Sequence, residues 1–286
     1  MAYTISEIQK TVEAQRAFFR TGTTLDVNWR LHQLRTLRDA VKAHEAEFED
    51  ALYKDLGRSR VEAYLCDIGP VIVEINEMLH GLRRWARPER HFSGLMCFPS
   101  LLTKVYKMPY GVTLVISPFN FPILLTLGVV AASISGGNTV VIKASAKSRN
   151  CTAVMKKFIA EVFPPEFVTL IDGGHDVADM CLEQRWDKIF YTGSPKIGRH
   201  VLAKAAENLT PVALELGGGN GELVHSQKRR RHQGCCAQDS ILQTLQCRAD
   251  LHQYQSDSGR SGNRGAISGC PEGRIHQTNR RKCSGQ

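Results

Sequence analysis

Two polar side chains in this sequence lie in settings that suit catalysis. Asn120 lies between Pro118 and Pro122, whose rings stiffen the chain. Its side-chain amide could donate hydrogen bonds to a developing oxyanion. Glu215 follows an apolar strand-like run and precedes a glycine pair. Partial desolvation there would raise its pKa and make it a general base. A turn asparagine and an ordinary strand-end glutamate are the alternative interpretations.

Two further segments carry groups that suit a nucleotide. Lys143 and Ser145 directly follow a β-branched run, a position suited to ribose hydroxyls, although a lysine there can also be a solvated strand end. Residues 191–198 lead from a strand pattern into a helix pattern, whose free N–H groups favour a phosphate. The glycine spacing there matches neither the G-x-G-x-x-G fingerprint nor a P-loop. The candidate phosphate-binding residues are Gly193, Ser194 and Gly198.

Alternating strand and helix patterns must position these residues. Short β-branched runs predict strands at 112–116, 139–142, 168–171, 188–191 and 212–214. Helical patterns lie between them, at 123–135, 151–162, 177–182 and 197–207. This alternation predicts an α/β fold with an open, parallel, Rossmann-like sheet. Its ligand crevice would lie at the carboxyl ends of the strands, where all the candidate residues are found.

The chain before this alternation reads as helical scaffold. Residues 25–56 predict one long amphipathic helix with Gly57 as its C-cap, and residues 61–85 predict another. We therefore expect residues 1–110 to form an N-terminal helical segment of the cofactor-binding domain. Residues 111–219 would form its Rossmann-like part.

The last segment, residues 220–286, has a different composition. The whole chain is 42% hydrophobic and 23% charged, as expected for a soluble globular protein. The tail holds 11 Lys and Arg against 5 Asp and Glu, so it contributes +6 of the formal charge of +9. It also holds five of the nine cysteines and one aromatic residue, Tyr254. Such a segment cannot bury enough apolar surface to offset its ordering entropy, so we expect it to be disordered.

Several function classes are disfavoured by the same features. The N-terminus has no signal-peptide pattern, and the longest apolar run, 123–135, is too short to span a bilayer, which predicts a soluble, cytosolic protein with reduced cysteines. No metal is expected, because Cys235 and Cys236 are adjacent and the other tail cysteines are scattered. The basic run 228–231 could bind nucleic acid, but no aromatic residues are interleaved to stack on bases.

Four segments carry the candidate residues: those around Asn120, Lys143 and Glu215, and residues 191–198. Their order and their amino-acid sequences closely resemble those of the aldehyde dehydrogenase superfamily, and within it the class 3, fatty-aldehyde-like branch. The resemblance covers roughly residues 5 to 218 and includes Glu62-Ala63-Tyr64, Gly69-Pro70-Val71, Phe190-Tyr191-Thr192-Gly193 and residues 209–218. It implies oxidation of an aldehyde to an acid through a thiohemiacetal, hydride transfer to NAD or NADP, and thioester hydrolysis.

The resemblance also implies a role for each candidate residue. Asn120 would be the oxyanion donor and Glu215 the base. Lys143 and Ser145 would contact the adenosine ribose, and Gly193 and Ser194 would face the pyrophosphate.

Two departures from the family pattern matter. Ala144 and Ala146 stand where the family commonly has a proline and an acidic residue. A carboxylate there would accept hydrogen bonds from the ribose hydroxyls and would repel the 2′-phosphate of NADP, and this chain lacks it. We therefore expect weaker NAD preference and tolerance of NADP. The family's nucleophile loop, of the type Asn-Ala-Gly-Gln-x-Cys, is also absent, and Cys247 has an unrelated setting, so we interpret it as incidental.

Codons can be chosen for residues 241–260 such that translation shifted by one base gives a sequence close to that nucleophile loop. We therefore interpret the tail as the product of a shifted reading frame. Two hypotheses remain for function. One is an NAD(P)-dependent aldehyde dehydrogenase by ancestry; the other, favoured for this polypeptide, is a non-catalytic remnant with at most weak nucleotide binding. By the resemblance, the segments through which family members oligomerise have no counterpart in the tail. Without the family's second domain the sheet would expose an apolar edge and an apolar face, and we expect poor solubility.

Overall fold

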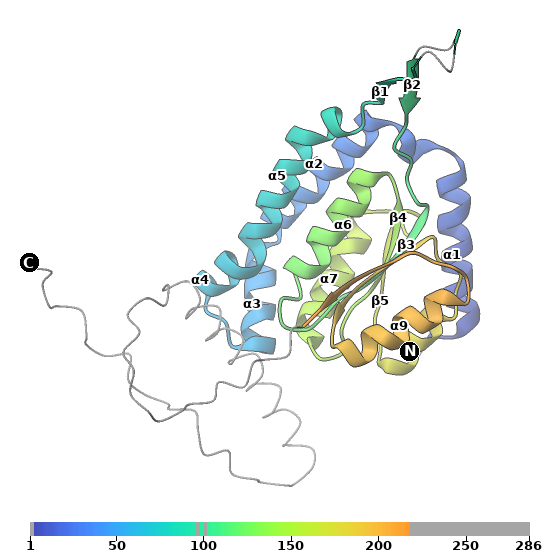
Figure 1. Cartoon of the computed structure of the whole chain (residues 1–286). Coiled ribbons are helices and arrows are strands. Elements are labelled where there is room, and N and C mark those ends of the chain that lie inside the picture. The colour runs from blue at the N-terminus through green and yellow to red at the C-terminus, as the bar shows by residue number, and fades with distance from the viewer. Residues whose placement is uncertain (1–2, 95–97, 100–101, 218–286) are drawn as a thin grey trace, which may run out of the picture.

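A five-stranded parallel sheet forms the centre of the protein (Figure 1). The computed structural model describes residues 3–94, 98–99 and 102–217. The sheet order is β5-β4-β3-β6-β7, and every neighbouring pair is parallel. The strands are β3 (Val112–Ile116), β4 (Thr139–Lys143), β5 (Val168–Ile171), β6 (Lys188–Gly193) and β7 (Val212–Leu216). The predicted α/β sheet and its five strands are confirmed.

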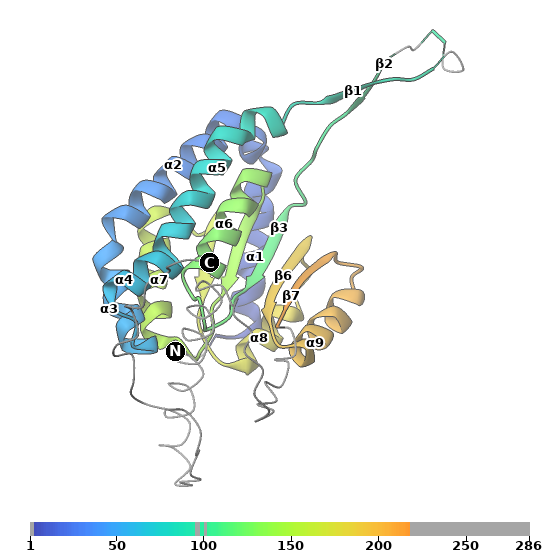
Figure 2. The same ribbon diagram turned by 60° about the vertical axis from the view of Figure 1, so that its left-hand side comes forward.

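Helices cover both faces of the sheet, and β3 and β4 are accordingly buried along nearly their whole length. Successive residues of β3 belong to different cores: Leu114 packs with one cluster and Val115 with the other. The helices α6 (Leu124–Gly136) and α7 (Arg149–Val162) cover the Val115 face together with earlier helices. The opposite face packs against α8 (His175–Leu182), α9 (Pro195–Ala206) and α1 (Ile5–Arg20) (Figure 2).

The N-terminal helices are more divided than the sequence predicts. They are α1, α2 (Val27–Ala43), α3 (Glu45–Leu56), α4 (Arg60–Ala63) and α5 (Gly69–Trp85), with a 3₁₀ turn at Thr23–Leu25 and a π-helical turn, η2, at Tyr64–Ile68. Helix α1 begins at a capping box between Thr4 and Glu7, and the sequence analysis did not predict it.

The single helix predicted for 25–56 is wrong, because the chain turns at His44. The backbone of His44 has φ −99° and ψ 12°, outside helical values. Its ring bonds the Ala40 carbonyl at 2.9 Å and the Glu161 carboxylate at 3.1 Å, and it packs against the Phe158 ring in a T-shaped arrangement. These contacts with α7 redirect α3 onto that helix. Gly57 ends α3 with a left-handed φ of 65°, as predicted.

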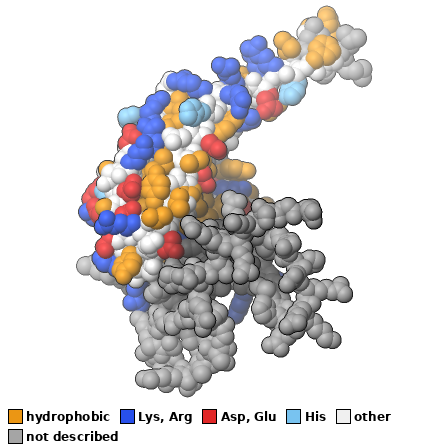
Figure 3. Space-filling model, turned by 90° about the vertical axis from the view of Figure 1, so that its left-hand side faces the viewer, with side chains coloured by type: hydrophobic (Ala, Val, Ile, Leu, Met, Phe, Trp, Pro, Cys, Tyr) orange, Lys and Arg blue, Asp and Glu red, His pale blue; other side chains and the backbone are white. Residues whose placement is uncertain are grey.

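A two-stranded antiparallel arm, β1 (Glu89–Phe92) and β2 (Leu102–Val105), projects from the body (Figure 2). Every side chain of both strands is exposed, and the sequence analysis did not predict them. Hydrophobic side chains also lie exposed on the side that carries α4 and α5, among them Val61, Leu65 and Val73 (Figure 3). These side chains lie on the N-terminal helical segments, so the expected exposure of an apolar edge and face of the sheet stays a prediction, as does poor solubility.

The predicted tail, residues 220–286, lies outside the described residues, together with Cys247, the basic run and the expectation of disorder. Within the described part, no helix is long and apolar enough to cross a membrane. The same residues contain no group of three or more His, Cys, Asp or Glu side chains that could hold a metal ion.

Candidate functional site

The sheet reverses its order of connection between β3 and β6. From β3 the chain proceeds through α6 to β4 on one side, whereas β6 leads through α9 to β7 on the other. In open α/β sheets, ligands bind in the crevice outside the carboxyl ends of the strands at such a switch point. The site should therefore lie where the chain leaves β3 and β6.

The strand register brings the four predicted segments to this one edge. Ile116, the last residue of β3, is level with Lys143 of β4 and with Tyr191 of β6. On the other side, Thr192 is level with Glu215 of β7. The segment containing Asn120, the Lys143 segment, the Gly193 turn and Glu215 thus share the carboxyl edge, although they are far apart in the sequence.

Asn120 lies in the segment that leads from β3 into α6, and it is half-buried. Its backbone carbonyl accepts a hydrogen bond of 2.7 Å from Nη2 of Arg58. The same guanidinium pairs with the carboxylate of Asp67, and both side chains are buried. The sequence analysis did not identify Arg58 or Asp67. Asp67 could have been found from the sequence, because it is a charged residue within an apolar stretch of the helical region.

Lys143 is buried, and its ammonium group is already bonded to the main chain. The Nζ atom donates to the carbonyl oxygens of Ala144 and Gly173, each at 2.8 Å. Desolvation lowers the pKa of Lys143, and nearby Cys181 and acidic groups partly oppose this effect. Ser145 is half-buried, and its hydroxyl accepts a hydrogen bond of 3.3 Å from the Lys147 backbone. The structure therefore places the two predicted ribose contacts at the same strand end.

The Gly193 turn leads directly into α9. Ser194 is the N-cap of this helix and accepts from the Ile197 backbone, so the helix N-terminus begins at the crevice. Gly193 leaves no room for a side chain, because a Cβ atom there would lie 2.7 Å from the Tyr191 ring. Gly198 is buried, and a Cβ atom would lie 2.6 Å from Leu216. Gly198 therefore allows close packing of helix on strand, and its cofactor contact stays a prediction.

Glu215 does not have the buried setting that the sequence analysis expected. It is exposed among the described residues, on β7, which is paired there only with β6. The expected desolvation is thus not supplied by this part of the chain, because nothing described here packs over the open edge of β7.

Two buried hydroxyls at the crevice were also missed. Ser117 Oγ directly follows β3 and Thr192 Oγ1 lies near the end of β6, and neither has a hydrogen-bond partner among the described residues. Buried polar groups are ordinarily bonded, so two such atoms beside the switch point fit a ligand with hydroxyl or amide groups. Ser117 and Thr192 could have been identified from the sequence, because each directly follows a predicted strand. A nicotinamide nucleotide fits these residues.

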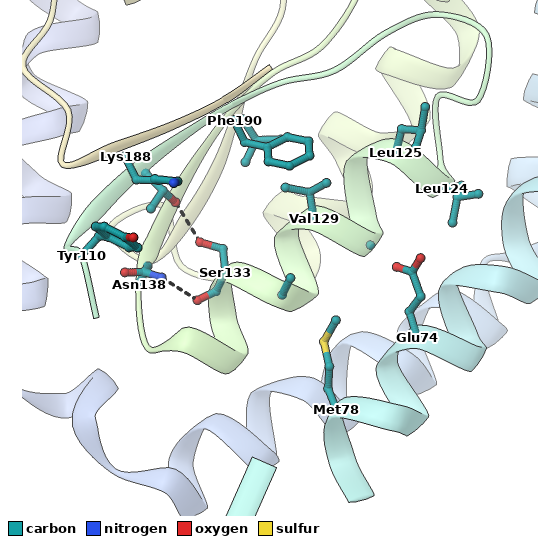
Figure 4. A pocket seen from close by; sticks show the side chains of 14 residues that line it. Glu74, Met78, Tyr110, Leu124, Leu125, Val129, Ser133, Asn138, Lys188 and Phe190 are labelled. Carbon is teal, nitrogen blue, oxygen red and sulfur yellow. Dashed lines mark hydrogen bonds between the residues drawn. The ribbon is translucent and has the colours of Figure 1, made fainter. Parts of the chain in front are cut away.

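A cavity of about 330 Å³ lies between α5, α6 and the β3–β6 part of the sheet (Figure 4). It begins at Leu124 and Leu125, one helical turn after Asn120, and most of its lining is apolar. The Glu74 carboxylate lies against α6 at Gly128, where a Cβ atom would collide with it. Burial raises the pKa of Glu74, and repulsion from Glu77 adds to the effect.

A family model and curated relatives match most of this chain. The model of the aldehyde dehydrogenase family matches residues 1–233. The chain is 39% identical over 211 residues to aldehyde dehydrogenase family 3 member F1 of Arabidopsis thaliana, covering 74% of this chain and 43% of that protein. It is 36% identical over 219 residues to 4,4'-diaponeurosporen-aldehyde dehydrogenase of Staphylococcus aureus, covering 76% of this chain and 47% of that protein.

Solved structures show the same likeness. The substrate-bound AldH of Staphylococcus aureus matches with a TM-score of 0.73 and 35% identity, over 76% of this chain and 46% of that one. Betaine aldehyde dehydrogenase of Staphylococcus aureus in complex with NAD+ matches with a TM-score of 0.68 and 26% identity, over 75% and 43%. The chain spans a little under half the length of these relatives. With its sheet and its sequence in agreement, this chain belongs to the aldehyde dehydrogenase family.

Proposed function

We propose that this chain binds NAD or NADP at the carboxyl edge of its sheet, as the cofactor-binding part of an enzyme that oxidises aldehydes to acids. The convergence of four separate segments on the edge beside the β3–β6 switch point carries the proposal. The buried, unpartnered hydroxyls of Ser117 and Thr192 support it, because both lie at that edge.

A bound nicotinamide would supply the hydride acceptor for aldehyde oxidation. The Asn120 amide would donate a hydrogen bond to the aldehyde oxygen as it becomes negatively charged. Glu215 would accept a proton from the water that releases the acid. The apolar cavity beyond Leu124 and Leu125 would accept an apolar chain of the aldehyde.

The described residues hold no cysteine suited to be the nucleophile. Desolvation raises the pKa of the buried Cys181 to about 12 and raises that of the buried Cys151 further. Desolvation also raises the pKa of the half-buried Cys66. A thiol attacks as its thiolate, so a raised pKa opposes reaction. This observation supports the second candidate function, a non-catalytic remnant that binds the nucleotide, and we favour it for this chain.

The ribose end of the crevice supports tolerance of NADP. Ala146 places no carboxylate beside Ser145, so a 2′-phosphate meets no repulsion from that position. The next residue, Lys147, lies with its ammonium group 5.0 Å from the centre of the Phe119 ring. That contact keeps a positive charge next to the segment that contains Asn120.

Calorimetric titration of the full chain with NAD and with NADP tests the proposal. We expect both nucleotides to bind, with only a weak preference for NAD. Absence of binding by either would overturn the proposal, and an isotherm with NAD alone would overturn the NADP part. Decanal and nucleotide are then added together while the absorbance of the reduced nicotinamide is followed. Binding without turnover is the result expected of the remnant, whereas turnover would establish the enzyme.

A further inference from the structure

The segment that contains Asn120 is held by two charged residues that the reaction scheme above does not use. Arg58 and Asp67 form an ion pair and are 3% and 0% exposed. Together they contact four residues of one short stretch, and these are Asn120, Phe121, Ile123 and Leu124.

Each group of the pair has a separate partner in that stretch. Arg58 Nη2 donates to the Asn120 carbonyl at 2.7 Å, and the guanidinium lies 4.5 Å from the centre of the Phe121 ring. Asp67 Oδ1 accepts from the backbone N–H groups of Ile123 and Leu124 at 3.1 and 3.0 Å, where α6 begins. The carboxylate thus satisfies two free N–H groups at the positive end of the helix. The stretch is fixed on both sides of Pro122.

Local structure explains why these side chains point inward. Gly57 ends α3 in the left-handed conformation, and Ser59 caps α4, so Arg58 lies in the turn between two helices. Asp67 lies in the π-helical turn η2, whose extra residue changes the direction of the side chains that follow. A Cβ atom at Gly69 would lie 2.9 Å from the Tyr64 carbonyl, so the close turn requires glycine there.

Stability alone is a poor explanation for the pair. Removing two charges from water carries a large desolvation cost, and apolar residues often replace a buried pair without loss of stability. What an apolar replacement could not provide is the set of directed hydrogen bonds to residues 120–124.

We propose that Arg58 and Asp67 are positioning residues that set the backbone of Asn120, and hence the place of its amide, at the mouth of the crevice. The inference rests on the proposed function for its catalytic meaning, because positioning matters to the reaction only if Asn120 is the oxyanion donor. The geometric claim is tested independently of any nucleotide.

The test uses the ¹⁵N-labelled full chain. The Asn120 side-chain NH₂ signals are assigned by their loss in Asn120→Asp, and backbone exchange of residues 120–124 is followed by mass spectrometry. In Arg58→Met and Asp67→Asn we expect the NH₂ signals to shift or broaden and backbone exchange to speed up about tenfold, as loss of a charged hydrogen bond implies. Arg58→Lys keeps a charge for Asp67 but cannot hold Asp67 and Asn120 in the same fork geometry, so a smaller shift is expected.

Arg16→Met is the matched control, because Arg16 pairs with Asp187 at 2.9 Å near the other end of the sheet. It should lower the melting temperature without moving the Asn120 signals. If Arg58→Met does not fold, Asp67→Asn and Arg58→Lys decide the question. Unchanged Asn120 signals and exchange in these folded variants would overturn the inference.

Nucleotide titration of the same variants separates this inference from the proposed function. We expect unchanged affinity for NADP, since neither Arg58 nor Asp67 is a predicted cofactor contact. Absence of nucleotide binding by the unmodified chain would overturn the proposed function. The effect of the variants on the Asn120 signals and on backbone exchange would still test the positioning role. A loss of NADP affinity in Arg58→Lys beyond that in Arg16→Met would instead make Arg58 part of the nucleotide site and overturn the positioning role.

Discussion

The ammonium nitrogen of Lys143 lies 2.8 Å from the carbonyl oxygen of Gly173, so the end of β4 is tied to the loop that follows β5. A second bond of 2.8 Å, to the Ala144 carbonyl, holds the same nitrogen at the strand end. Lys143 is therefore held in place by the main chain, and a ribose would meet a donor of fixed position.

Replacing Lys143 should weaken nucleotide binding more than it changes the fold. In Lys143→Met the apolar stem remains, and the lost charged hydrogen bond should cost about tenfold or more in affinity for NADP. Calorimetry on folded samples measures this loss. Lys157→Met, which removes an exposed lysine paired with Glu47 and Glu161, is the control and should bind normally. Equal affinities in the two variants would contradict the ribose assignment.

Asp55 caps a helix that begins almost a hundred residues later. Its carboxylate accepts from the backbone of Asn150 at 3.2 Å and of Cys151 at 2.8 Å, in the first turn of α7. Asp55→Ala should lower the free energy of unfolding by about 1–2 kcal/mol, and Asp55→Asn by less. Urea unfolding measures both. Asp50→Ala, which removes only a surface pair with Lys54, should change it by less than about 1 kcal/mol; a loss as large as that of Asp55→Ala would argue against the cap.

Glu74 should make stability depend on pH. Burial and Glu77 raise its pKa in the folded state. For an acid with a raised folded pKa, the unfolded chain loses its proton first, so stability is complete below the unfolded pKa of about 4.3 and falls as pH rises through the folded pKa. Glu74→Gln should therefore be more stable than the unmodified chain at pH 7, with the difference vanishing near pH 4.

Chemical unfolding at the two pH values checks this sign. The control is Glu13→Gln, an exposed glutamate of α1 whose acceptor role toward Gln9 a glutamine can keep. A destabilised Glu74→Gln at pH 7, or a difference that grows on acidification, would show that the carboxylate is stabilising in its ionised form.

Leu209 adopts a left-handed backbone conformation, with φ 53°, and is 90% exposed. A leucine there carries the cost of that conformation without the gain of burial. Leu209→Gly should raise the free energy of unfolding by about 1 kcal/mol, measured as a shift in the melting temperature. Leu202→Gly, at an exposed position inside α9, should lower it by about 1 kcal/mol. A loss of stability in Leu209→Gly would show that the left-handed conformation of Leu209 does not destabilise the fold.

The sequence by itself determined the sheet and the edge where the candidate residues meet. Strands β3 and β4 are buried on both faces, and such strands appear as continuous β-branched runs between helical patterns. The order of strands and helices then predicts that Asn120, Lys143 and Gly193 lie at carboxyl ends, because parallel strands share one direction.

Only the tertiary structure decided how those residues are held. The turn at His44 depends on Glu161 and Phe158, which lie far along the chain. The hydrophobic periodicity of residues 25–56 cannot reveal such a contact. The pairing of Arg58 with Asp67 and the exposure of Glu215 likewise follow from packing between distant segments. Periodicity reports which face of an element is buried, whereas the identity of the group it is buried against is set when the chain folds.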